Sequence, residues 1–399
     1  MRFQDHQMIH VYLKMAEDKV PVGSLALRDR RIYFEYARDF LRAGLQISPL
    51  KLPLKSGILS SPDLVFEGLF GVFNDSLPDG WGCLLLDRKL MKTGMNPGDL
   101  TPLDRLCYVG HTGMGALIYE PEIGMPDPLP HENFDEIDRE IKDFQENDND
   151  QFVDDLLSLN GSSAGARPKI LVEHEGADWL IKFRSSMDQL DIGAIEYAYH
   201  LMAKDAGLIL PEAKLFPSRN GSGFFGVKRF DRRNGKRYHM HTMSGLLHAD
   251  HRMPSLDYET VMKATLFLTK NVVECEKQFR VAVFNVLSCN RDDHAKNFAF
   301  LMDENGEWAL SPTYDIVFSS GPAGEHSTTI MGEGKNPTKD HLLKLASVAQ
   351  VKKGRALEII DEVKEAICAW EKFADLAQVN PRSYQLIQRT VSTLIEVAG

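Results

Sequence analysis

A short polar segment between two apolar stretches limits what this chain can fold into more than any other feature. Residues 290–298 read NRDDHAKNF, preceded by VAVFNVLSC and followed by FAFLM. Charged and amide side chains placed beside buried elements cost desolvation free energy unless they are paired or perform a task. The pattern therefore predicts a functional loop held between two buried elements, with a plain polar loop as the alternative.

Within this loop, Asp292 and Asn297 enclose four residues. This is the spacing of a kinase catalytic loop, in which the Asp accepts the proton of the attacked hydroxyl and the Asn ligates Mg²⁺. Asp293 is a second carboxylate beside the predicted base, and the spacing to Asn297 favours Asp292. Asp315, in SPTYDI, follows Asn297 by eighteen residues, where the second metal-binding acid of a kinase should fall. Alone, a Tyr-Asp pair is more typical of a turn, but in series with the loop it predicts a metal ligand.

Upstream of the loop, Lys182 lies in WLIKF on a predicted strand that precedes a helix bearing Glu196. A strand lysine paired with a helix glutamate holds the α- and β-phosphates of ATP in protein kinases. Either residue could instead face solvent, Lys182 on an alternating strand and Glu196 on a helix surface. Before this strand, NGSSAGARPK at residues 160–169 carries small residues that let backbone amides approach a phosphate. It is neither a GxGxxG nor a Walker loop, so a flexible linker is the alternative.

The length of 399 residues suits two or three domains. Residues 1–125 alternate apolar and polar side chains in MIHVYLKMAE, which predicts short antiparallel strands, and prolines mark the end of this subdomain. Residues 126–256 begin with acidic helices and continue as a β-rich stretch with one helix, whereas residues 257–399 are mainly helical. The sequence therefore predicts an α+β, two-lobed, protein-kinase-like fold, with a β-rich N-lobe, an all-α C-lobe and an extra small N-terminal α/β subdomain.

Local signals define the elements of the middle segment. Residues 132–155 carry eleven acidic side chains, one Arg and one Lys, with apolar residues at helical spacing, which predicts solvated acidic helices. One hairpin turn is predicted at residues 175–177 and another at 220–223. Between the hairpins, DIGAIEYAYHLMAKDAG predicts a helix with Asp191 as N-cap and Gly207 at its C-terminal end.

Charge and cysteine usage narrow the function classes. The formal net charge is −11, so the chain is a poor nucleic-acid binder by itself and would reach DNA only through a partner. The five cysteines are scattered and form no CxxC pair, which favours reduced thiols over a disulfide framework or a zinc site. No apolar run is long enough for a transmembrane helix, and the N-terminus lacks the pattern of a signal peptide. We therefore expect no membrane association and a cytoplasmic protein.

The segments GSSAGARPK, VKRFDRR, DDHAKNF and TYDI, in this order, resemble the HipA family of toxin kinases. The resemblance covers nearly the whole chain, because VFNDSLPDGWG and GMGALIYEP are similar to the small N-terminal domain of the family. DDHAKNF together with TYDI is its most specific part. It implies an ATP-dependent serine/threonine protein kinase that uses Mg²⁺.

The resemblance also implies roles for individual residues. Asp292 becomes the catalytic base, with Asn297 and Lys182 as further catalytic residues, and Asn297 and Asp315 become the Mg²⁺ ligands. Ser162 is the implied autophosphorylation site, with the adjacent Ser163 as the alternative. In the family, phosphate on this serine ejects the loop from the ATP site, as its added negative charge would favour. The implied nucleotide contacts are Lys169, Lys182, Lys228, Arg229, Phe230, His294 and Lys296, of which residues 228–230 form the hinge under adenine.

This chain departs from the family pattern in two places. Asp293 stands where a small residue is common, which places two carboxylates side by side. Arg167 and Pro168 stand in the loop where other members differ, and Pro168 is expected to stiffen the loop. Neither departure removes a part that phosphoryl transfer requires.

Members of the family are toxins neutralised by a small helix-turn-helix antitoxin (HipB-like) that holds DNA and represses the shared operon. The best-known protein substrate is glutamyl-tRNA synthetase, whose phosphorylation arrests growth and leads to persistence. Two other readings stay open. One is a small-molecule kinase of the aminoglycoside-phosphotransferase type, which would share the Asp, the Asn and the metal-binding Asp. The other is a catalytically silent partner in a repressor complex. For the N-terminal subdomain we hypothesise a role in docking the antitoxin and restraining the kinase lobes.

Overall fold

The computed structural model describes residues 8–61, 63–123, 133–147, 150–160 and 165–398. The chain forms two compact units. Unit 1 consists of Met1–Met187, Arg229–His248 and Leu301–Glu307, and unit 2 of Asp188–Lys228, Ala249–Phe300 and Trp308–Gly399. Each unit combines segments that are distant in the sequence, and the domain boundaries at residues 125 and 256 stay a prediction.

Unit 1 is built on a five-stranded sheet in the order β4-β3-β2-β1-β5, in which all neighbouring strands are antiparallel. Alternate residues of β1, such as Ile9 and Val11, are buried on one face. This alternation is the pattern from which strands were expected in the N-terminal segment. The strands are β1 (Met8–Leu13), β2 (Val20–Arg28), β3 (Arg31–Tyr36), β4 (Ile58–Ser60) and β5 (Leu117–Glu120).

The predicted acidic helices are present in unit 1 as α5 and α6. In α5 the apolar side chains of Ile137, Ile141 and Phe144 are buried at helical spacing, so the acidic residues occupy the opposite face. Helix α6 packs against α3 and against strand β6. The helices of unit 1 are α1 (Arg38–Ala43), α2 (Gly71–Asn74), α3 (Gly80–Lys92), α4 (Pro102–Val109), α5 (Phe134–Asn147), α6 (Val153–Asn160) and α8 (Met243–Leu247), with 3-10 turns η1 (Pro97–Asp99) and η2 (Asp150–Phe152).

The hairpin predicted around residues 175–177 is formed by β6 (Lys169–His174) and β7 (Ala177–Lys182), which pair antiparallel. Its two turn residues, Glu175 and Gly176, have φ of 52° and 72°. Positive φ at both positions is the geometry of a tight turn whose twist matches the strands. Unit 1 is completed by β10 (Arg232–Arg233), β11 (Lys236–Arg237) and β12 (His239–Thr242).

Unit 2 contains the helix predicted between the hairpins, α7 (Ile192–Asp205). Asp191 is its N-cap residue, as predicted, but its side chain makes no capping hydrogen bond. The Asp191 carboxylate instead accepts hydrogen bonds from the Asn380 amide (2.8 Å) and the Ser383 hydroxyl (2.9 Å), where helix α14 begins. Strands β8 (Ala213–Phe216) and β9 (Phe224–Lys228) form the second predicted hairpin.

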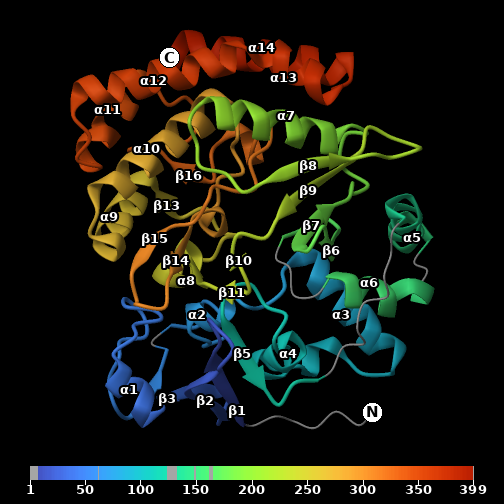
Figure 1. Cartoon of the computed structure of the whole chain (residues 1–399), viewed down its shortest axis with the longest axis vertical. Coiled ribbons are helices and arrows are strands. Elements are labelled where there is room, and N and C mark those ends of the chain that lie inside the picture. The colour runs from blue at the N-terminus through green and yellow to red at the C-terminus, as the bar shows by residue number, and fades with distance from the viewer. Residues whose placement is uncertain (1–7, 62, 124–132, 148–149, 161–164, 399) are drawn as a thin grey trace. The chain divides into compact units, whose positions relative to one another are not determined.

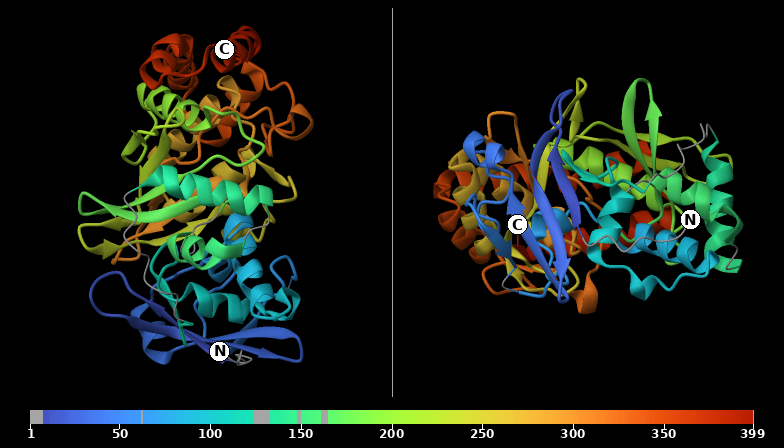
Figure 2. Two further views of the ribbon diagram at one scale, coloured as in Figure 1. Left: turned by 90° about the vertical axis from the view of Figure 1, so that its right-hand side faces the viewer. Right: turned by 90° about the horizontal axis from the view of Figure 1, so that it is seen from below.

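The rest of unit 2 is mainly helical, as predicted for the C-terminal segment. Helix α10 packs against α9, α11, α12 and α14, and almost its whole second half is buried. Helices α12, α13 and α14 are grouped at the C-terminal end of the chain, with α7 packed on α13 (Figure 1 and Figure 2). The helices are α9 (Tyr258–Thr269), α10 (Val272–Leu287), α11 (Lys339–Val348), α12 (Lys353–Cys368), α13 (Trp370–Ala377) and α14 (Pro381–Ala398).

Short elements carry the loops on which the site depends. Strand β13 (Leu256–Asp257) pairs in parallel with β16 (Thr328–Thr329). The others are β14 (Ala299–Met302), β15 (Trp308–Leu310), η3 (Ala295–Asn297) and η4 (Pro322–Gly324). None of the helices in the described ranges combines the length and the apolar character needed to cross a membrane.

Candidate active site

The polar loop begins where α10 ends, and its first residues are fixed from two sides. Cys289 turns the chain out of the helix with a φ of 58°. The buried side chain of Asn290 donates from Nδ2 to Asn285 Oδ1 (2.9 Å), so the loop is tied to the last turn of α10. Arg291 donates from Nη1 to the carbonyl oxygen of Gly324 (2.6 Å). The polar loop predicted from sequence is therefore positioned before its acidic residues begin.

The two adjacent carboxylates have opposite environments. Asp293 is 1% exposed, and its Oδ2 accepts a hydrogen bond from the Tyr258 hydroxyl (3.0 Å) and lies 2.9 Å from His326 Nδ1. Its Oδ1 accepts a hydrogen bond from the Thr328 amide (3.2 Å). Asp292, by contrast, is exposed. Asp293 is thus built into the interior of unit 2, whereas Asp292 presents its carboxylate at the surface of the loop.

The buried network around Asp293 includes a tyrosine with a raised pKa. Burial raises the pKa of Tyr258 well above its usual value, and the neighbouring Asp293 charge raises it further. The Tyr258 hydroxyl in turn accepts a hydrogen bond from Asn285 Nδ2 (2.9 Å). A carboxylate with this many partners is a structural anchor for the loop.

Asn297 is joined to Asp292 through the backbone. Its Nδ2 donates to the Asp292 carbonyl oxygen (2.7 Å), and its own amide donates to the His294 carbonyl oxygen (2.9 Å). With Nδ2 used in this way, the amide oxygen Oδ1 is the atom that can ligate a hard cation. His294 Nδ1 accepts from the Lys296 amide (3.3 Å), so this ring caps η3.

Asp315 follows β15 and has an unusual backbone conformation. Its φ is 56°, in the left-handed region that non-glycine residues seldom occupy. The preceding residue, Tyr314, donates its hydroxyl to the Lys296 carbonyl oxygen and so ties this segment to the polar loop. Strained backbone of this kind concentrates at functional sites, which supports the prediction that Asp315 is more than a turn residue.

The donor set suits Mg²⁺ shared with phosphates. Among the described residues, no group of three or more His, Cys, Asp and Glu side chains could by itself enclose a metal ion. Mg²⁺ keeps several waters and is usually held by one or two carboxylates plus substrate phosphates. One carboxylate at Asp315 and one amide oxygen at Asn297 fit that mode of binding.

Unit 1 brings two of the predicted phosphate-contacting lysines together. Lys169 on β6 and Lys182 on β7 are direct partners in the antiparallel register. Like charges opposite each other destabilise a strand pair unless opposite charges lie nearby. Lys169 Nζ also lies at the base of the predicted phosphate loop, 2.3 Å from where a Cβ on Gly165 would stand. Ile181, which precedes Lys182, is buried, and Lys182 itself is half-buried.

Glu196 lies in unit 2 on α7. One alternative was that it faces solvent on the surface of the helix. The residue is 2% exposed, so it is not a helix-surface glutamate. A buried carboxylate is retained only where partners satisfy it. The side chain is therefore not solvated, and its pairing with a strand lysine stays a prediction.

The predicted hinge residues are engaged in other contacts. Arg229 donates from Nη2 to Asp231 Oδ2 (2.8 Å) and to the Gly113 carbonyl oxygen (3.1 Å), and its amide donates to the Asp178 carbonyl oxygen (2.8 Å). Burial would raise the pKa of Asp231, but the Arg229 and Arg232 charges outweigh it and lower the pKa to about 2. The Arg229 side chain therefore connects to the Gly-rich turn of the N-terminal subdomain, and its place at the nucleotide stays a prediction.

The neighbours of Arg229 in the predicted hinge are arranged differently. The Lys228 amide donates to the Glu212 carbonyl oxygen (2.8 Å), and its Nζ lies 3.6 Å from Glu212 Oε2. Phe230 is buried.

Ser162 and Ser163, the predicted autophosphorylation sites, lie outside the described residues.

A second constellation in unit 1 has the geometry of a hydrolase triad. Ser48 Oγ lies 3.0 Å from His241 Nε2, and His241 Nδ1 lies 2.6 Å from Asp75 Oδ2. Ser48 is 1% exposed and His241 is 0% exposed, so no substrate can reach the hydroxyl. Thr242 donates to the other oxygen of Asp75 (2.6 Å) and completes a buried network. The contacts fasten α2 to the segment that carries α8, and their role is structural.

Sequence reasoning missed the residues that support the site. Tyr258 and His326 lie more than thirty residues from Asp293 on either side, in segments that carry no motif. Tyr314 gave no signal of its own beyond its place in TYDI. The hydrogen bonds of Asp231 could not be predicted, because Arg and Asp are mostly exposed in proteins and sequence alone favours a surface position for them.

The fold and the loops define a known class of protein. The family description for HipA-like C-terminal domains matches residues 161–370, more than half of the chain. The description for HipA N-terminal domains matches residues 13–120. The chain therefore belongs to the HipA family, and the predicted α+β kinase-like fold with an extra N-terminal subdomain is confirmed.

Two curated relatives carry names that describe them as putative kinases. "Putative kinase Y4dM" of Sinorhizobium fredii is 22% identical over 255 residues, covering 59% of this chain and 60% of the relative. A "Putative kinase" of Haemophilus influenzae is 28% identical over 136 residues, covering 31% of this chain and 40% of the relative. The chain thus matches about 60% and 40% of the lengths of these two relatives.

A solved structure from Shewanella oneidensis MR-1 has the same fold along nearly the whole chain. It is HipA in the complex of a toxin–antitoxin system with HipB and operator DNA. The TM-score is 0.69, with 16% identity, and the match covers 96% of this chain and 95% of the HipA chain.

Proposed function

We propose that this protein is an ATP-dependent serine/threonine protein kinase whose catalytic base is Asp292. The proposal rests on the different environments of the two adjacent aspartates in the polar loop. Asp293 is anchored in the interior, while the carbonyl oxygen of the exposed Asp292 is held by Asn297 at 2.7 Å. An exposed carboxylate next to an amide that could ligate Mg²⁺ matches two of the parts that a kinase catalytic loop supplies for phosphoryl transfer.

In the proposed reaction, Asp292 accepts the proton of a substrate hydroxyl as the hydroxyl oxygen bonds to the γ-phosphorus of ATP. The bond between that phosphorus and the β,γ-bridging oxygen breaks, and ADP leaves. Asn297 and Asp315 would hold Mg²⁺, which, when bound, neutralises phosphate charge. Lys169 and Lys182 supply positive charge, since they stand opposite each other on β6 and β7.

We further propose contacts at the edges of the nucleotide. Lys228 and Phe230 would line the adenine side, partly through backbone groups, and Arg229 would support them by its link to the N-terminal subdomain. His294 and Lys296 would lie near the phosphates beside the loop that they help to shape. Ser162, with Ser163 as the alternative, would be the residue that the kinase phosphorylates on itself.

The N-terminal subdomain would restrain the phosphate loop. The Trp81 amide at the start of α3 donates to the Gly165 carbonyl oxygen (3.2 Å), where the loop returns to β6. A Cβ on Gly80 would stand 3.1 Å from Ala166 Cα, so the two backbones pack closely. A partner that moves α3 could thus reach the loop through backbone contacts.

We propose that this partner is a helix-turn-helix antitoxin of the HipB kind, and that the chain meets DNA only as part of that complex. The support is membership of the HipA family and the fold shared with HipA in the Shewanella complex. The net charge of −11 agrees with leaving DNA contacts to the partner. The protein substrate we put forward is glutamyl-tRNA synthetase in the cytoplasm, whose modification would arrest growth.

A transfer assay with labelled ATP tests the proposal. Wild-type protein and the Asp292→Asn variant are incubated with Mg²⁺, [γ-³²P]ATP and purified glutamyl-tRNA synthetase. We expect label on protein with the wild type only. Label on the synthetase would also identify the substrate. Label found only on an added aminoglycoside would move the assignment to a small-molecule kinase. Label on neither would leave the silent repressor partner.

A further inference from the structure

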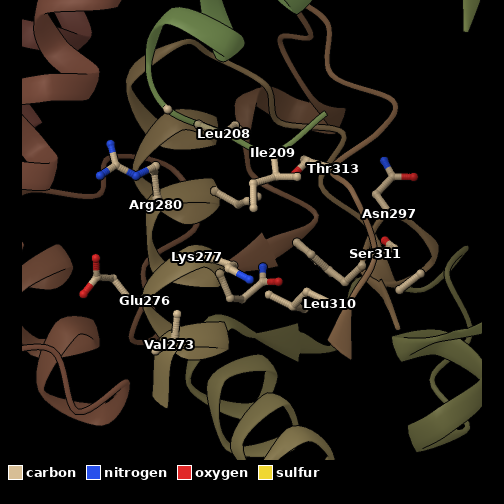
Figure 3. Close-up of a pocket in the computed structure, with 15 residues that line it drawn as sticks. Leu208, Ile209, Val273, Glu276, Lys277, Arg280, Asn297, Leu310, Ser311 and Thr313 are labelled. Atoms are coloured by element: carbon tan, nitrogen blue, oxygen red, sulfur yellow. The ribbon is translucent and has the colours of Figure 1, made fainter. Parts of the chain in front are cut away.

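Three arginines are half-buried among the described residues of unit 2, and one of them differs from the others in its partners. Arg280, which lines the pocket shown in Figure 3, has its Nη2 2.6 Å from Glu362 Oε2. Arg355 donates from Nε to Glu276 Oε1 (3.0 Å). Arg291 forms no ion pair with any carboxylate of the described residues. A half-buried charge without a counter-charge costs free energy, and an anion beside Arg291 would lower that cost.

The guanidinium group of Arg291 faces the segment that follows Asp315. Its Nη1 donates to the carbonyl oxygens of Gly324 (2.6 Å) and Ser320 (3.5 Å), and its Nη2 donates to that of Lys335 (3.2 Å). All three acceptors are neutral. The hydrogen bonds to Ser320 and Lys335 lie at the surface, whereas Nε is buried. An anion can therefore reach the two Nη atoms from solvent.

The backbone of the same segment is fixed around Arg291. The Arg291 amide donates to the Ser319 carbonyl oxygen (3.1 Å), and the Ser327 amide donates to the Arg291 carbonyl oxygen (3.1 Å). A Cβ on Gly321 would stand 2.8 Å from Arg291 Cβ, so the turn between the two serines packs directly on the arginine. Ala323 in this turn has a φ of 53°, which is uncommon for a residue with a side chain. Strain of this kind is concentrated at functional and switch regions.

Of the three serines beside Arg291, one is exposed. Ser320 is exposed, and its carbonyl oxygen lies 3.5 Å from Arg291 Nη1. Ser327 is buried and donates its hydroxyl to the Arg291 carbonyl oxygen (3.2 Å). Ser319 is half-buried, and its hydroxyl oxygen accepts from the Gly321 amide (3.3 Å). Ser320 is therefore the serine that a modifying enzyme reaches without opening the segment.

We propose that Ser320 is a phosphorylation site whose phosphate pairs with Arg291. In the transfer, Ser320 Oγ bonds to the γ-phosphorus of ATP, the bond to the β,γ-bridging oxygen breaks, ADP leaves, and the hydroxyl proton passes to the base of the modifying kinase. The phosphate adds about −1.5 to −2 charges beside the guanidinium. Charge-assisted hydrogen bonds of this kind are about twice as strong as those to neutral acceptors, so the phosphate would replace carbonyl oxygens at Nη1 and Nη2.

The modifying kinase is a different serine kinase that uses ATP. Arg291 directly precedes Asp292, so a chain that brought Ser320 to its own Asp292 would have to break the contacts around Arg291. The charged side chains of the segment act in opposite directions. Exposed Lys335 would favour a phosphate on Ser320, and exposed Glu325 would oppose it. Since these two charges offset each other, the uncompensated Arg291 is the group that selects the phosphate.

Phosphate on Ser320 would also regulate this protein. Phosphorylation switches act by adding a charge that pairs with arginine and orders or loosens a segment. Because Arg291 is the neighbour of Asp292, a change in its contacts acts directly beside the proposed base. This regulatory part rests on the proposed kinase function, whereas the pairing of the phosphate with Arg291 does not.

Titration of the phosphate by ³¹P NMR tests the pairing without relying on kinase activity. Phosphoserine is inserted at position 320 of the full chain during translation, with Asp292→Asn present so that the chain adds no phosphate to itself. Pairing with a cation favours the dianion, so the proton affinity of this phosphate should be at least about threefold lower in the folded chain than in the chain unfolded in urea. Arg291→Gln should remove the difference, and Arg291→Lys, which keeps the charge, should retain part of it.

Lys335→Gln is the matched control, because it removes an exposed positive charge from the same segment and leaves Arg291 in place. It should preserve most of the difference in proton affinity. Equal proton affinity in the folded and unfolded chains, or a difference that survives Arg291→Gln, would overturn the pairing. If Arg291→Gln does not fold, Arg291→Lys decides, and complete loss of the difference in a folded Arg291→Lys chain would also overturn it.

Peptide mapping of the Asp292→Asn chain, isolated from cells of its own host, tests whether the site is used. We expect phosphate on Ser320. Its absence from both growing and starved cells would overturn the modification. Phosphate that appears only when an active copy of the chain is also present would overturn the different kinase and assign the transfer to a second copy.

The regulatory part is measured as the rate of phosphoryl transfer by the otherwise wild-type chain with and without phosphate on Ser320. We expect a change of at least threefold. Equal rates would overturn the regulatory part. No transfer by either chain would contradict the proposed kinase function, while the ³¹P titration would still decide the pairing with Arg291.

Discussion

At the scale of single residues, two neighbouring aspartates with the same side chain are expected to respond in opposite ways to the same substitution. Asp292→Asn removes the proposed base from an exposed position, so phosphoryl transfer should fall about 10²–10⁴-fold with little change in stability. Asp293→Asn leaves a buried network incomplete and should cost about 2–5 kcal/mol of the free energy of unfolding. Transfer rates and urea unfolding of both variants check this. Loss of stability in Asp292→Asn with activity retained in Asp293→Asn would reverse the assignment.

Asp315 permits a second contrast, because its φ of 56° suits glycine better than alanine. Asp315→Gly and Asp315→Ala both remove the proposed metal ligand and should weaken Mg²⁺-ATP binding at least tenfold. Asp315→Gly should be about 1–2 kcal/mol more stable than Asp315→Ala, because glycine adopts a positive φ without backbone strain. Calorimetric titration and thermal unfolding separate the two effects. Normal ATP turnover in the glycine variant would show that Asp315 is no metal ligand.

The role of a residue can be predicted from the sequence when its signal lies in neighbouring residues, and not when it depends on contacts with distant segments. Asp292 and Asn297 were predicted because their spacing is itself the signal, and the structure joins them by a 2.7 Å hydrogen bond. The different surroundings of Asp293 could not be predicted, since Tyr258 and His326 reach it through tertiary packing. Arg229 was expected to line the adenine pocket, and that role stays a prediction, whereas the hydrogen bond from its side chain to the buried Asp231 could not be predicted.

At the scale of elements, the hairpins and the helix α7 were predictable because turn and cap signals act within a few residues. Glu175 and Gly176 take the predicted turn. The Asp191 carboxylate shows the limit of such signals. It stands at the predicted cap position, but its hydrogen bonds go to the start of α14, far along the chain. No local pattern contains that information.

The contact between α3 and the base of the phosphate loop gives a prediction at this scale. Gly80→Val should press on Ala166, because even a Cβ at Gly80 stands 3.1 Å from Ala166 Cα. We expect a loss of about 1–3 kcal/mol of stability together with weaker Mg²⁺-ATP binding. Gly354→Ala in α12 is the matched control, since a Cβ there meets nothing within 4 Å and alanine favours the helix. Unchanged ATP affinity in Gly80→Val would remove the proposed link.

At the scale of the whole molecule, the sequence predicted the fold class, whereas the division into units had to come from the structure. The chain leaves one unit and enters the other between Lys228 and Arg229, inside a segment predicted as a single hinge. Compact units depend on which distant segments pack together, and single-sequence patterns carry no such information. Membership of the HipA family, by contrast, was accessible because a few short motifs in a fixed order were sufficient to suggest it.

Stability of the whole molecule should fall with acid. Burial is the main cause that lowers the pKa of His239 in unit 1 and of His200 in unit 2 to about 4, from about 6.5. Because both pKa values are lower in the folded chain, the unfolded chain binds more protons than the folded chain between about pH 6.5 and 4. Stability is therefore complete above about pH 6.5 and is lost as the pH falls toward 4, by about 1.4 kcal/mol per pH unit for each histidine.

Urea unfolding between pH 7.5 and 4.5 measures this loss. The His200→Gln variant should show a slope against pH that is smaller by about 1.4 kcal/mol per unit, because one titrating group is gone. Parallel curves for the wild type and the variant would mean that His200 does not titrate in this way.

The central claim is that this chain transfers phosphate from ATP by means of Asp292. Intact-mass spectrometry tests it most directly, on phosphatase-treated wild-type and Asp292→Asn protein incubated with Mg²⁺-ATP, followed by peptide mapping. The account predicts that only the wild type gains phosphate, at Ser162 or Ser163. No phosphate on the wild type, or equal phosphate on both proteins, would contradict it.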